Sequence, residues 1–358
     1  MRRLLLPLVG LCAFISVGGC SQVIADKVLV PPRNLTREAG LMKARHKIEA
    51  RWDNKLRPFI YKSFDGTQLA GMLFEPRAPK AEAEGKPTTR PAPIAAEAPV
   101  KPKGLIVVIH GLTDRKEAML SVAESYAEAG YVAVCPDLRA HGESGGKYTS
   151  LGYYEKRDMM ALLNHLQQQG YDVSRVGAFG GSLGAAISIQ WAAIDPRVKS
   201  IIAVAPFAEL RSELTHAYAK FNIGSLIAAV IEDAAQKEGR FKIGDVSPLQ
   251  SLAAMDTPLY LAHGFRDTLI PDSESQRLFE AARGPVVYQR AIAGHIDIRD
   301  ALGKPFMKRS IEWMNAYVPA DTAAHKYPMW VTHYGSRNFP MTAPVAVSDG
   351  VEAATPTP

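Results

Sequence analysis

The sequence contains three cysteines in 358 residues, and no two of them are placed to form a disulfide. Cys12 and Cys20 belong to an apolar N-terminal segment, and Cys135 lies alone in a short apolar run. A disulfide-stapled fold is therefore excluded, and Cys135 is expected to be a small buried residue rather than a reactive thiol. No cluster of His, Cys and Asp has the spacing of metal ligands, so we expect neither a metal nor a cofactor.

Long apolar runs and dense basic blocks are also absent. After the first twenty residues no run approaches twenty apolar residues, which excludes a membrane-spanning helix in that part of the chain. The net charge is +6 at pH 7, but Lys and Arg are scattered, so we expect no nucleic-acid partner. With 47% hydrophobic and 22% charged residues and no internal repeat, the composition is that of a globular protein with one large or two small domains.

The first twenty residues have the pattern of an export signal. An Arg-Arg start is followed by an apolar stretch from Leu4 to Gly19, which is too short to span a membrane comfortably. The stretch ends Val-Gly-Gly-Cys, which resembles the bacterial lipobox, where small residues precede a cysteine that becomes lipidated. Residues 1–20 are therefore predicted to be a lipoprotein signal peptide with Cys20 as the lipidation site. An ordinary cleaved signal and an uncleaved anchor are the alternatives.

Acyl chains on Cys20 would hold the mature protein on a membrane, because each buried CH2 group adds about 0.8 kcal/mol of membrane affinity. Ser21 follows the cysteine. In lipoproteins that this segment resembles, an aspartate at that position often causes retention at the inner membrane. The sequence therefore predicts an exported bacterial lipoprotein on the periplasmic side of the outer membrane.

Residues 21–57 are polar and mixed and are predicted to form an N-terminal tether, with a surface helix from about residue 37 to 51. A hairpin follows, because two strand-like runs flank the strong turn dipeptide Asp65-Gly66. Seven of the 25 prolines, and no aromatic residue, lie between residues 76 and 103. Residues 77–103 are therefore predicted to be a mobile loop inserted in one domain, the alternative being an interdomain linker.

From Gly104 onward, short apolar runs alternate with helical patterns. The expected strands are uniformly apolar and occupy residues 105–109, 131–135, 176–179, 200–205, 258–262 and 286–290. Strands without polar alternation are typical of a parallel sheet that helices cover on both faces. The predicted fold class is therefore α/β, with a mostly parallel central sheet in a domain of residues 58–318.

Two segments depart from this alternation. Residues 206–254 are longer than a crossover needs and mostly helical in pattern, with an apolar stretch from Ile223 to Ile231. We predict a cap insertion over the C-terminal edge of the sheet, either a lid that shapes a substrate site or helices that only pack. Residues 319–358 are loose in composition and are predicted to be a poorly ordered tail.

The stretch Val-Gly-Ala-Phe-Gly-Gly-Ser-Leu-Gly at residues 176–184 predicts an apolar strand, a tight corner and a helix. Gly180, Ser182 and Gly184 fit the G-x-S-x-G pattern of a nucleophile elbow. A serine at such a corner is held in a strained conformation, and neighbours without Cβ let the strand and the helix approach closely. Its hydroxyl would stand above the sheet, beside amides at the helix start that can stabilise an anion.

A serine nucleophile needs a base, and the base needs an acid that holds its tautomer. Asp267 and His295 each follow an apolar strand downstream of Ser182. Because ligands bind along the C-terminal edge of open α/β sheets, these three side chains are expected to converge there. The backbone amides of Leu112 and Leu183 are predicted to form the oxyanion hole.

Taken together, these motifs resemble those of the α/β-hydrolase superfamily, most of all the branch of monoacylglycerol-lipase-like esterases and serine aminopeptidase-like hydrolases. The resemblance covers about residues 59–317. It rests on His110-Gly111, Asp137 to Ser144, Gly180 to Gly184, His263-Gly264 with Asp267, and Gly294-His295. It implies a triad in the order Ser, Asp, His and is poorly specific for substrate. Ala140 departs from the pattern, because relatives often have glycine there.

The other candidates for chemistry have weaker support. His110, His141 and His263 precede glycines at strand ends, where the resemblance implies that they fix loops. Asp272, Asp297 and Glu143 are rival acids that are less well placed than Asp267. The remaining histidines have no supporting context: His46, His165, His216, His325 and His333.

The predicted function is that of a membrane-anchored serine hydrolase, which cleaves a small or lipid-like carboxylic ester through an acyl-enzyme. One alternative is a peptidase or an acyltransferase with the same triad, although no acidic pair in the cap announces a pocket for a substrate amine. Another is a catalytically silent lipoprotein that only binds. Acyl length, the alcohol part and the oligomeric state are left open.

Overall fold

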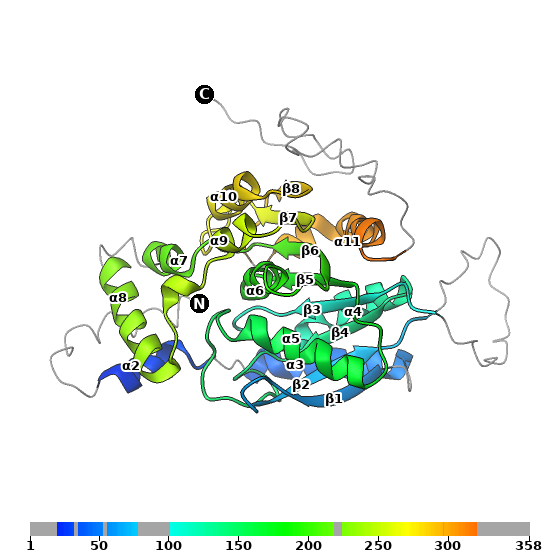
Figure 1. The fold of residues 1–358 in the computed structure, drawn as a ribbon, viewed down its shortest axis with the longest axis horizontal. Coiled ribbons are helices and arrows are strands. Elements are labelled where there is room, and N and C mark those ends of the chain that lie inside the picture. Colours follow the sequence, from blue (N-terminus) through cyan, green and yellow to red (C-terminus); the bar gives the residue numbers. More distant parts are fainter. Residues whose placement is uncertain are drawn as a thin grey trace, which may run out of the picture.

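The structure, a computed structural model, describes residues 20–31, 35–52, 56–77, 101–217, 224–295 and 297–320. The predicted signal peptide up to residue 19, most of the 77–103 loop and the tail from residue 321 lie outside these residues. The described residues form one eight-stranded sheet with helices on both of its faces (Figure 1).

The strand order in the sheet is β1-β2-β4-β3-β5-β6-β7-β8. The predicted hairpin is present: β1 (Leu56–Lys62) and β2 (Gln68–Phe74) pair antiparallel, and β2 also pairs antiparallel with β4 (Val132–Pro136). All other neighbouring strands pair parallel. Strand β3 (Leu105–Ile109) lies between β4 and β5 (Val176–Gly181). Strand β5 pairs next with β6 (Val198–Val204), β6 with β7 (Leu259–Gly264), and β7 with β8 (Val286–Ala291). The mostly parallel α/β fold is therefore confirmed.

Each face of the sheet has its own apolar core. The first face is covered by α5 (Glu155–Gln168), α6 (Leu183–Ala192), α9 (Pro248–Ala253) and α10 (Asp272–Ala281). The opposite face is covered by α4 (Leu120–Glu128), which a 3-10 turn (Lys116–Met119) precedes, and by α11 (Ile298–Tyr317), which bends at Gly303. Because both faces are covered, β3 and β4 consist entirely of buried residues.

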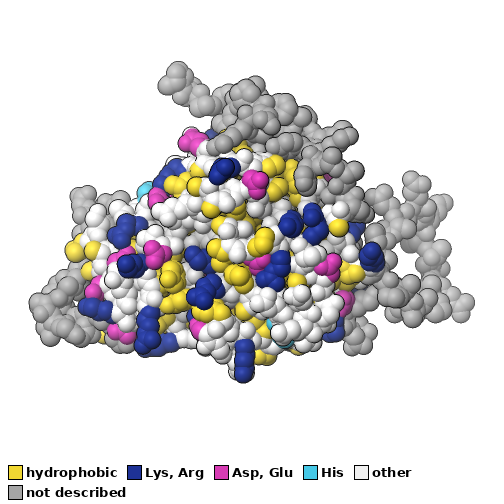
Figure 2. Space-filling view, viewed as in Figure 1, with side chains coloured by type: hydrophobic (Ala, Val, Ile, Leu, Met, Phe, Trp, Pro, Cys, Tyr) yellow, Lys and Arg dark blue, Asp and Glu magenta, His cyan; other side chains and the backbone are white. Residues whose placement is uncertain are grey.

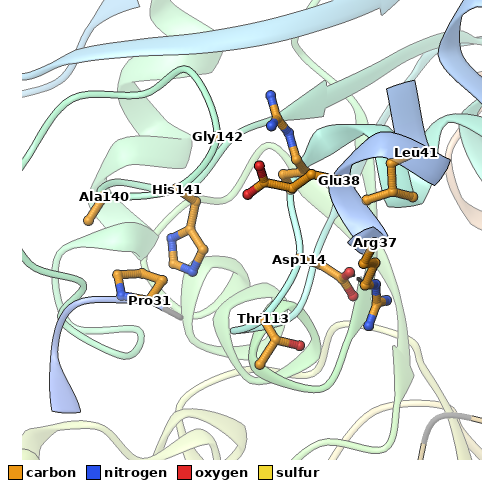
Figure 3. A pocket seen from close by; sticks show the side chains of 10 residues that line it. Pro31, Arg37, Glu38, Leu41, Thr113, Asp114, Ala140, His141 and Gly142 are labelled. Atoms are coloured by element: carbon orange, nitrogen blue, oxygen red, sulfur yellow. Dashed lines mark ion pairs between the residues drawn. The ribbon is translucent and has the colours of Figure 1, made fainter. Parts of the chain in front are cut away.

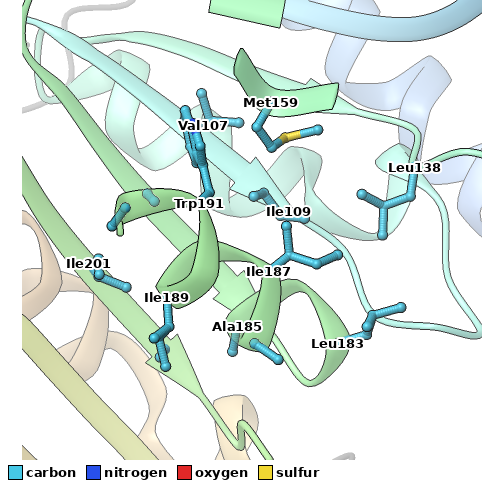
Figure 4. Packing of buried hydrophobic residues seen from close by; sticks show 14 of the residues in the cluster. Val107, Ile109, Leu138, Met159, Leu183, Ala185, Ile187, Ile189, Trp191 and Ile201 are labelled. Carbon is cyan, nitrogen blue, oxygen red and sulfur yellow. The ribbon is translucent and has the colours of Figure 1, made fainter. Parts of the chain in front are cut away.

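Helix α6 lies at the centre of the first core. All ten of its residues are buried, which explains why it shows no amphipathic pattern. Figure 4 shows Ile187 and Trp191 of α6 packed with Val107 of β3 and Met159 of α5. Burial of one such large side chain contributes roughly 1.5–3 kcal/mol, so this packing holds the start of α6, and the serine before it, in place.

Residues 206–254, the predicted cap, form α7 (Leu210–Ala217), α8 (Gly224–Ala234), a π-helical turn (Ala235–Gly239), a 3-10 turn (Ile243–Asp245) and α9. Helix α8 lies beside α2 (Cys20–Val28), the first described helix of the chain (Figure 1). Ala25 of α2 and the following Leu29 are fully buried, and the Thr149 amide donates to the Leu29 carbonyl at 2.8 Å.

The second N-terminal helix, α3 (Leu35–Trp52), covers the predicted helix 37–51. Its last residue, Trp52, is fully buried and donates its indole N–H to Glu124 at 2.7 Å. The Trp52 ring packs edge-on against Phe74 with the ring centroids 5.0 Å apart, and Arg45 forms an ion pair with Glu117 at 3.0 Å. The segment predicted as a tether thus contains two helices that pack against the rest of the fold.

The surface shown in Figure 2 carries Lys and Arg side chains interspersed with acidic and apolar ones. None of the helices described here is both long enough and apolar enough to cross a membrane. Within the described ranges, no three His, Cys, Asp or Glu side chains gather where they could hold a metal ion. Cys135 is a buried free thiol in β4.

Candidate active site

Ser182 sits at the corner between β5 and α6. Its backbone angles are φ 53° and ψ −119°, a conformation that residues with a side chain rarely adopt. The corner is held by the Ser182 amide, which donates to the Val204 carbonyl at 2.8 Å, and by the Ala185 amide, which donates to the Ser182 carbonyl at 3.0 Å. The strain is therefore maintained by the sheet on one side and by the helix on the other.

Gly180 and Gly184 are required by close backbone approach at this corner. A Cβ on Gly180 would lie 2.2 Å from the Gly184 carbonyl oxygen, and a Cβ on Gly184 would lie 2.3 Å from the Ile109 carbonyl oxygen. Both distances are far below a van der Waals contact. The two outer glycines of the G-x-S-x-G pattern thus let α6 start directly against the ends of β5 and β3.

Ser182, His295 and Asp267 form a continuous chain of hydrogen bonds. His295 Nε2 lies 2.9 Å from Ser182 Oγ, and His295 Nδ1 lies 2.6 Å from Asp267 Oδ2. The carboxylate can only accept, so Nδ1 carries a proton toward Asp267 and Nε2 is free to accept the serine proton. The three residues come from the loops after β5, β7 and β8, and the structure brings together the side chains that the sequence analysis grouped.

The predicted oxyanion donors lie on either side of this serine. Leu183 is the first residue of α6, where backbone N–H groups have no acceptor within the helix. Leu112 follows Gly111, whose added Cβ would lie 3.4 Å from the Ser182 Cβ, so the loop after β3 passes directly beside the serine. In the described turns and loops, neither the Leu112 amide nor the Leu183 amide donates to a backbone carbonyl.

Comparison with known proteins agrees with this architecture. Residues 100–242 match the family model described as "Serine aminopeptidase, S33". The structure of esterase Pf2001 from Pyrococcus furiosus superposes on 75% of this chain and 95% of its own, with a TM-score of 0.56 and 21% identity. The chain has the α/β-hydrolase fold.

Two curated relatives are similar to part of this chain. The uncharacterized protein YqkD of Bacillus subtilis is 30% identical over 192 residues, which are 52% of this chain and 63% of YqkD. The match therefore spans just under two thirds of that relative. The monoacylglycerol lipase of Mycolicibacterium smegmatis is 24% identical over 226 residues, covering 54% of this chain and 80% of the lipase.

Asp267 is held as a carboxylate. Burial alone would raise its pKa, but hydrogen bonds from His263 and His295 and from the Leu269 amide outweigh burial, and the pKa of Asp267 is lowered. His263 is itself fixed: its Nε2 lies 3.0 Å from the Ile270 carbonyl and 3.3 Å from Asp267 Oδ2, and its Nδ1 lies 2.6 Å from Ser275 Oγ. His263 thus supports the acid rather than the serine.

The rival acids are engaged by other partners. Glu143 forms ion pairs with Lys116 at 2.9 Å and Arg45 at 3.3 Å, and Asp272 pairs with Arg290 and accepts from Tyr288. Asp297 precedes α11, close to Gly294. Among the described hydrogen bonds, His295 pairs with Asp267 and with none of these three.

One acidic residue near the site was missed by the sequence analysis. Glu213 of α7 has a buried oxygen, Oε2, with no hydrogen-bond partner among the described residues. Burial, and then the neighbouring Glu274 and Asp267, raise the pKa of Glu213 to about 8. Glu274 itself accepts from the Ala208 amide at 2.9 Å and pairs with Arg277 at 3.0 Å. In the sequence, Glu213 is one acid in a helical pattern, and only the fold brings it near Asp267.

Proposed function

We propose that this protein hydrolyses carboxylic esters with Ser182 as the nucleophile, His295 as the general base and acid, and Asp267 as the residue that orients His295. The proposal is carried by the hydrogen-bond chain through these side chains, with lengths of 2.9 and 2.6 Å. Similarity to a monoacylglycerol lipase and to a putative esterase supports an ester as the substrate.

In the first half of the reaction, Ser182 Oγ bonds to the acyl carbon while its proton passes to His295 Nε2. The carbonyl oxygen becomes an oxyanion that accepts hydrogen bonds from the Leu112 and Leu183 amides. When the intermediate collapses, the bond to the alcohol oxygen breaks, and the leaving alkoxide takes the proton from Nε2. The acyl group is then esterified to Ser182.

In the second half, water gives a proton to His295 Nε2 and attacks the acyl carbon. The same two amides hold the second oxyanion, and the carboxylic acid leaves as Ser182 regains a proton. Asp267 stabilises the imidazolium in both halves, and its lowered pKa keeps it ionised across the pH range in which His295 works. Ester and water give acid and alcohol, so the reaction needs no cofactor.

A series of p-nitrophenyl esters from short to long acyl chains tests this proposal and measures the acyl preference. Hydrolysis in Asp267→Asn should fall by about 10⁴-fold, because the wrong imidazole tautomer then faces the serine. His46→Gln is the matched control, since His46 is exposed on α3, and it should keep the full rate. Unchanged hydrolysis in Asp267→Asn would contradict the assignment.

A peptidase is the second candidate, and Glu213 is the observation that favours it. Its unpartnered carboxyl lies near Asp267, and a substrate ammonium bound there would ionise it and replace the missing partner. Aminoacyl anilides assayed beside the esters distinguish the two candidates. A peptidase would prefer the anilides and lose that preference in Glu213→Gln, whereas an esterase would prefer the esters in both forms.

Membrane attachment through acyl chains on Cys20 is part of the proposal, with the protein on the periplasmic side of the outer membrane. Helix α2 begins at Cys20 and lies beside α8 of the cap. Val23 of α2 and Leu226 of α8 are 46% and 49% exposed. Acyl chains at Cys20 would therefore place the cap next to the lipid surface, an arrangement that suits a lipid-like ester.

Metabolic labelling with an alkyne fatty acid during bacterial expression tests the attachment. The protein should carry the label and sediment with outer membranes, and Cys20→Ser should lose both properties. Cys135→Ala, which removes the buried thiol, is the control and should keep the label. Labelling that persists in Cys20→Ser would contradict the proposed anchor.

A further inference from the structure

His141 lies between two backbone carbonyl groups. It is 4% exposed, its Nδ1 is 2.8 Å from the Arg139 oxygen, and its Nε2 is 2.8 Å from the Leu112 oxygen. Carbonyl oxygens can only accept hydrogen bonds, and a neutral imidazole has a single N–H. A neutral ring would therefore place an unprotonated nitrogen against one of the two carbonyl oxygens, an unfavourable contact between two buried acceptors. Only the imidazolium, with a proton on each nitrogen, satisfies both contacts.

His110, whose ring centroid is 5.0 Å from that of His141, has the opposite requirement. The Leu138 amide donates to His110 Nε2 at 3.0 Å, so this nitrogen is unprotonated, and Nδ1 carries the proton that is donated to the Gly111 oxygen at 2.8 Å. His110 is thus a neutral imidazole. Burial, and then the charge on His141, hold the pKa of His110 well below its ordinary value, in agreement with this tautomer.

The two rings hold the two peptide groups that flank the Leu112 Cα. The Gly111 oxygen and the Leu112 N–H belong to one planar trans peptide, so a bond from His110 to that oxygen also sets the direction of the N–H. The Leu112 oxygen belongs to the next peptide, which His141 holds. With both peptides fixed, the Leu112 amide cannot rotate away from its orientation beside Ser182.

We infer that His141, as an imidazolium, and His110, as a neutral imidazole, are positioning residues that hold the Leu112 amide as an oxyanion donor. This inference rests on the proposed function, because it assigns the two rings to the oxyanion hole of that reaction. Neither ring touches the reacting atoms, and both act through the loop after β3.

An acidic residue lies beside His141. Figure 3 shows His141 lining a pocket with Asp114, which forms an ion pair with Arg37 at 2.5 Å. Burial raises the pKa of Asp114, and Arg37, Arg299 and His141 offset only part of that rise. The charged and titratable groups near His141 and Asp114 are His110, which follows β3, Asp114 and Arg115 from the loop after it, Arg37 and Glu38 from α3, and Arg299 from α11.

The protonation states can be read directly by nitrogen NMR of the protein labelled at histidine, with His141→Gln and His110→Gln used to assign the signals. At pH 7, both ring nitrogens of His141 should carry protons, and His110 should carry one, on Nδ1. A single proton on His141 at pH 7 would overturn the inference. This measurement does not use activity, so it stands apart from any failure of the proposed ester hydrolysis, which Asp267→Asn tests.

Separate measurement of kcat and KM tests the positioning role. His141→Gln should lower kcat by about tenfold to a hundredfold with little change in KM, because an oxyanion donor acts in the transition state. The fall in kcat should be smaller in His141→Lys, whose ammonium group can still donate to a carbonyl oxygen. A kcat in His141→Gln equal to that of the wild type would overturn the assignment, and His46→Gln is the control that should leave kcat intact.

Discussion

Two corners at the same edge of the sheet hold a residue with a side chain in a conformation that favours glycine. Ser182, after β5, has a φ of 53°, and Ala140, in the turn after β4, has a φ of 63°. For a residue with a Cβ, such a conformation costs roughly 1–2 kcal/mol. The two corners therefore share a positive φ at a residue with a Cβ and differ in what that residue supplies.

At Ser182 the strain is tied to a side chain, because the hydroxyl lies 2.9 Å from His295 Nε2. At Ala140 the positive φ serves only the course of the backbone, and the Ala140 amide donates to the Gly145 oxygen at 2.8 Å. A glycine could follow that path without strain. Backbone strain alone therefore does not identify a functional residue. Strain at a residue whose side chain glycine cannot replace does.

Substitution of Ser182 gives the largest expected effect and separates strain from chemistry. Ser182→Ala and Ser182→Gly should both lose at least about 10⁴-fold in ester hydrolysis, because neither supplies a nucleophile. Ser182→Gly should be about 1 kcal/mol more stable than Ser182→Ala, since the two differ only in the strained Cβ. Denaturant unfolding of both variants measures the difference, and equal stabilities would show that the corner is not strained.

Gly184, two residues after the serine, tests the lack of room for a side chain at the corner rather than its backbone strain. Gly184→Ala would place a Cβ 2.3 Å from the Ile109 oxygen, and backbone atoms cannot move aside as a flexible side chain can. We expect a loss of about 3 kcal/mol in the free energy of unfolding, measured by denaturant titration. Gly170→Ala is a control at which an added Cβ meets nothing within 4 Å, although its φ of 88° adds strain alone. A loss no larger in Gly184→Ala than in this control would contradict the packing argument.

Near the Ser182 corner, Glu213 lowers the stability of the folded protein when its buried carboxyl group is ionised. Its pKa is raised from 4.5 to about 8, so between these values the folded protein holds a proton that the unfolded chain has released. The free energy of unfolding should therefore fall as the pH rises from about 4.5 to about 8, by roughly 4 kcal/mol from this group. Unfolding measured at pH 5 and pH 8 should show Glu213→Gln gaining stability over the wild type at pH 8. An equal difference at both pH values would argue against a raised pKa.

Ala140→Gly gives the smallest expected effect. Removing the Cβ relieves the positive φ, and the greater freedom of glycine in the unfolded chain opposes part of the gain. We expect a net stabilisation of about 0.5–1 kcal/mol with unchanged ester hydrolysis, in contrast to Ser182→Gly. A melting temperature that falls instead would mean that the alanine methyl contributes packing that outweighs its strain.

The sequence was informative where chemistry depends on motif order and on the ends of strands. Ser182, Asp267 and His295 could be grouped because each follows a recognisable apolar strand, and parallel strands end at a common edge. Ala140 also stood out in the sequence, because α/β-hydrolases that the motifs resemble often have glycine there, and its φ is 63°. These features depend on local patterns and on one general property of the fold.

What could not be predicted depends on contacts between distant segments. Nothing in a helical pattern marks Glu213 as a neighbour of Asp267, and the contact of His141 with the Leu112 oxygen joins residues from different loops. The hydrogen bond from the buried Trp52 to Glu124 likewise joins a polar N-terminal segment to the folded domain. Each depends on side-chain placement that strand and helix patterns do not specify.

Labelling with a fluorophosphonate followed by peptide mass spectrometry tests the central claim most directly, because the reagent reacts with a serine that an adjacent base activates. The account predicts one adduct, on the peptide that contains Ser182, with none in Ser182→Ala and much slower labelling in Asp267→Asn. An adduct that forms at the same rate in Ser182→Ala, or no adduct in the wild-type protein, would contradict it.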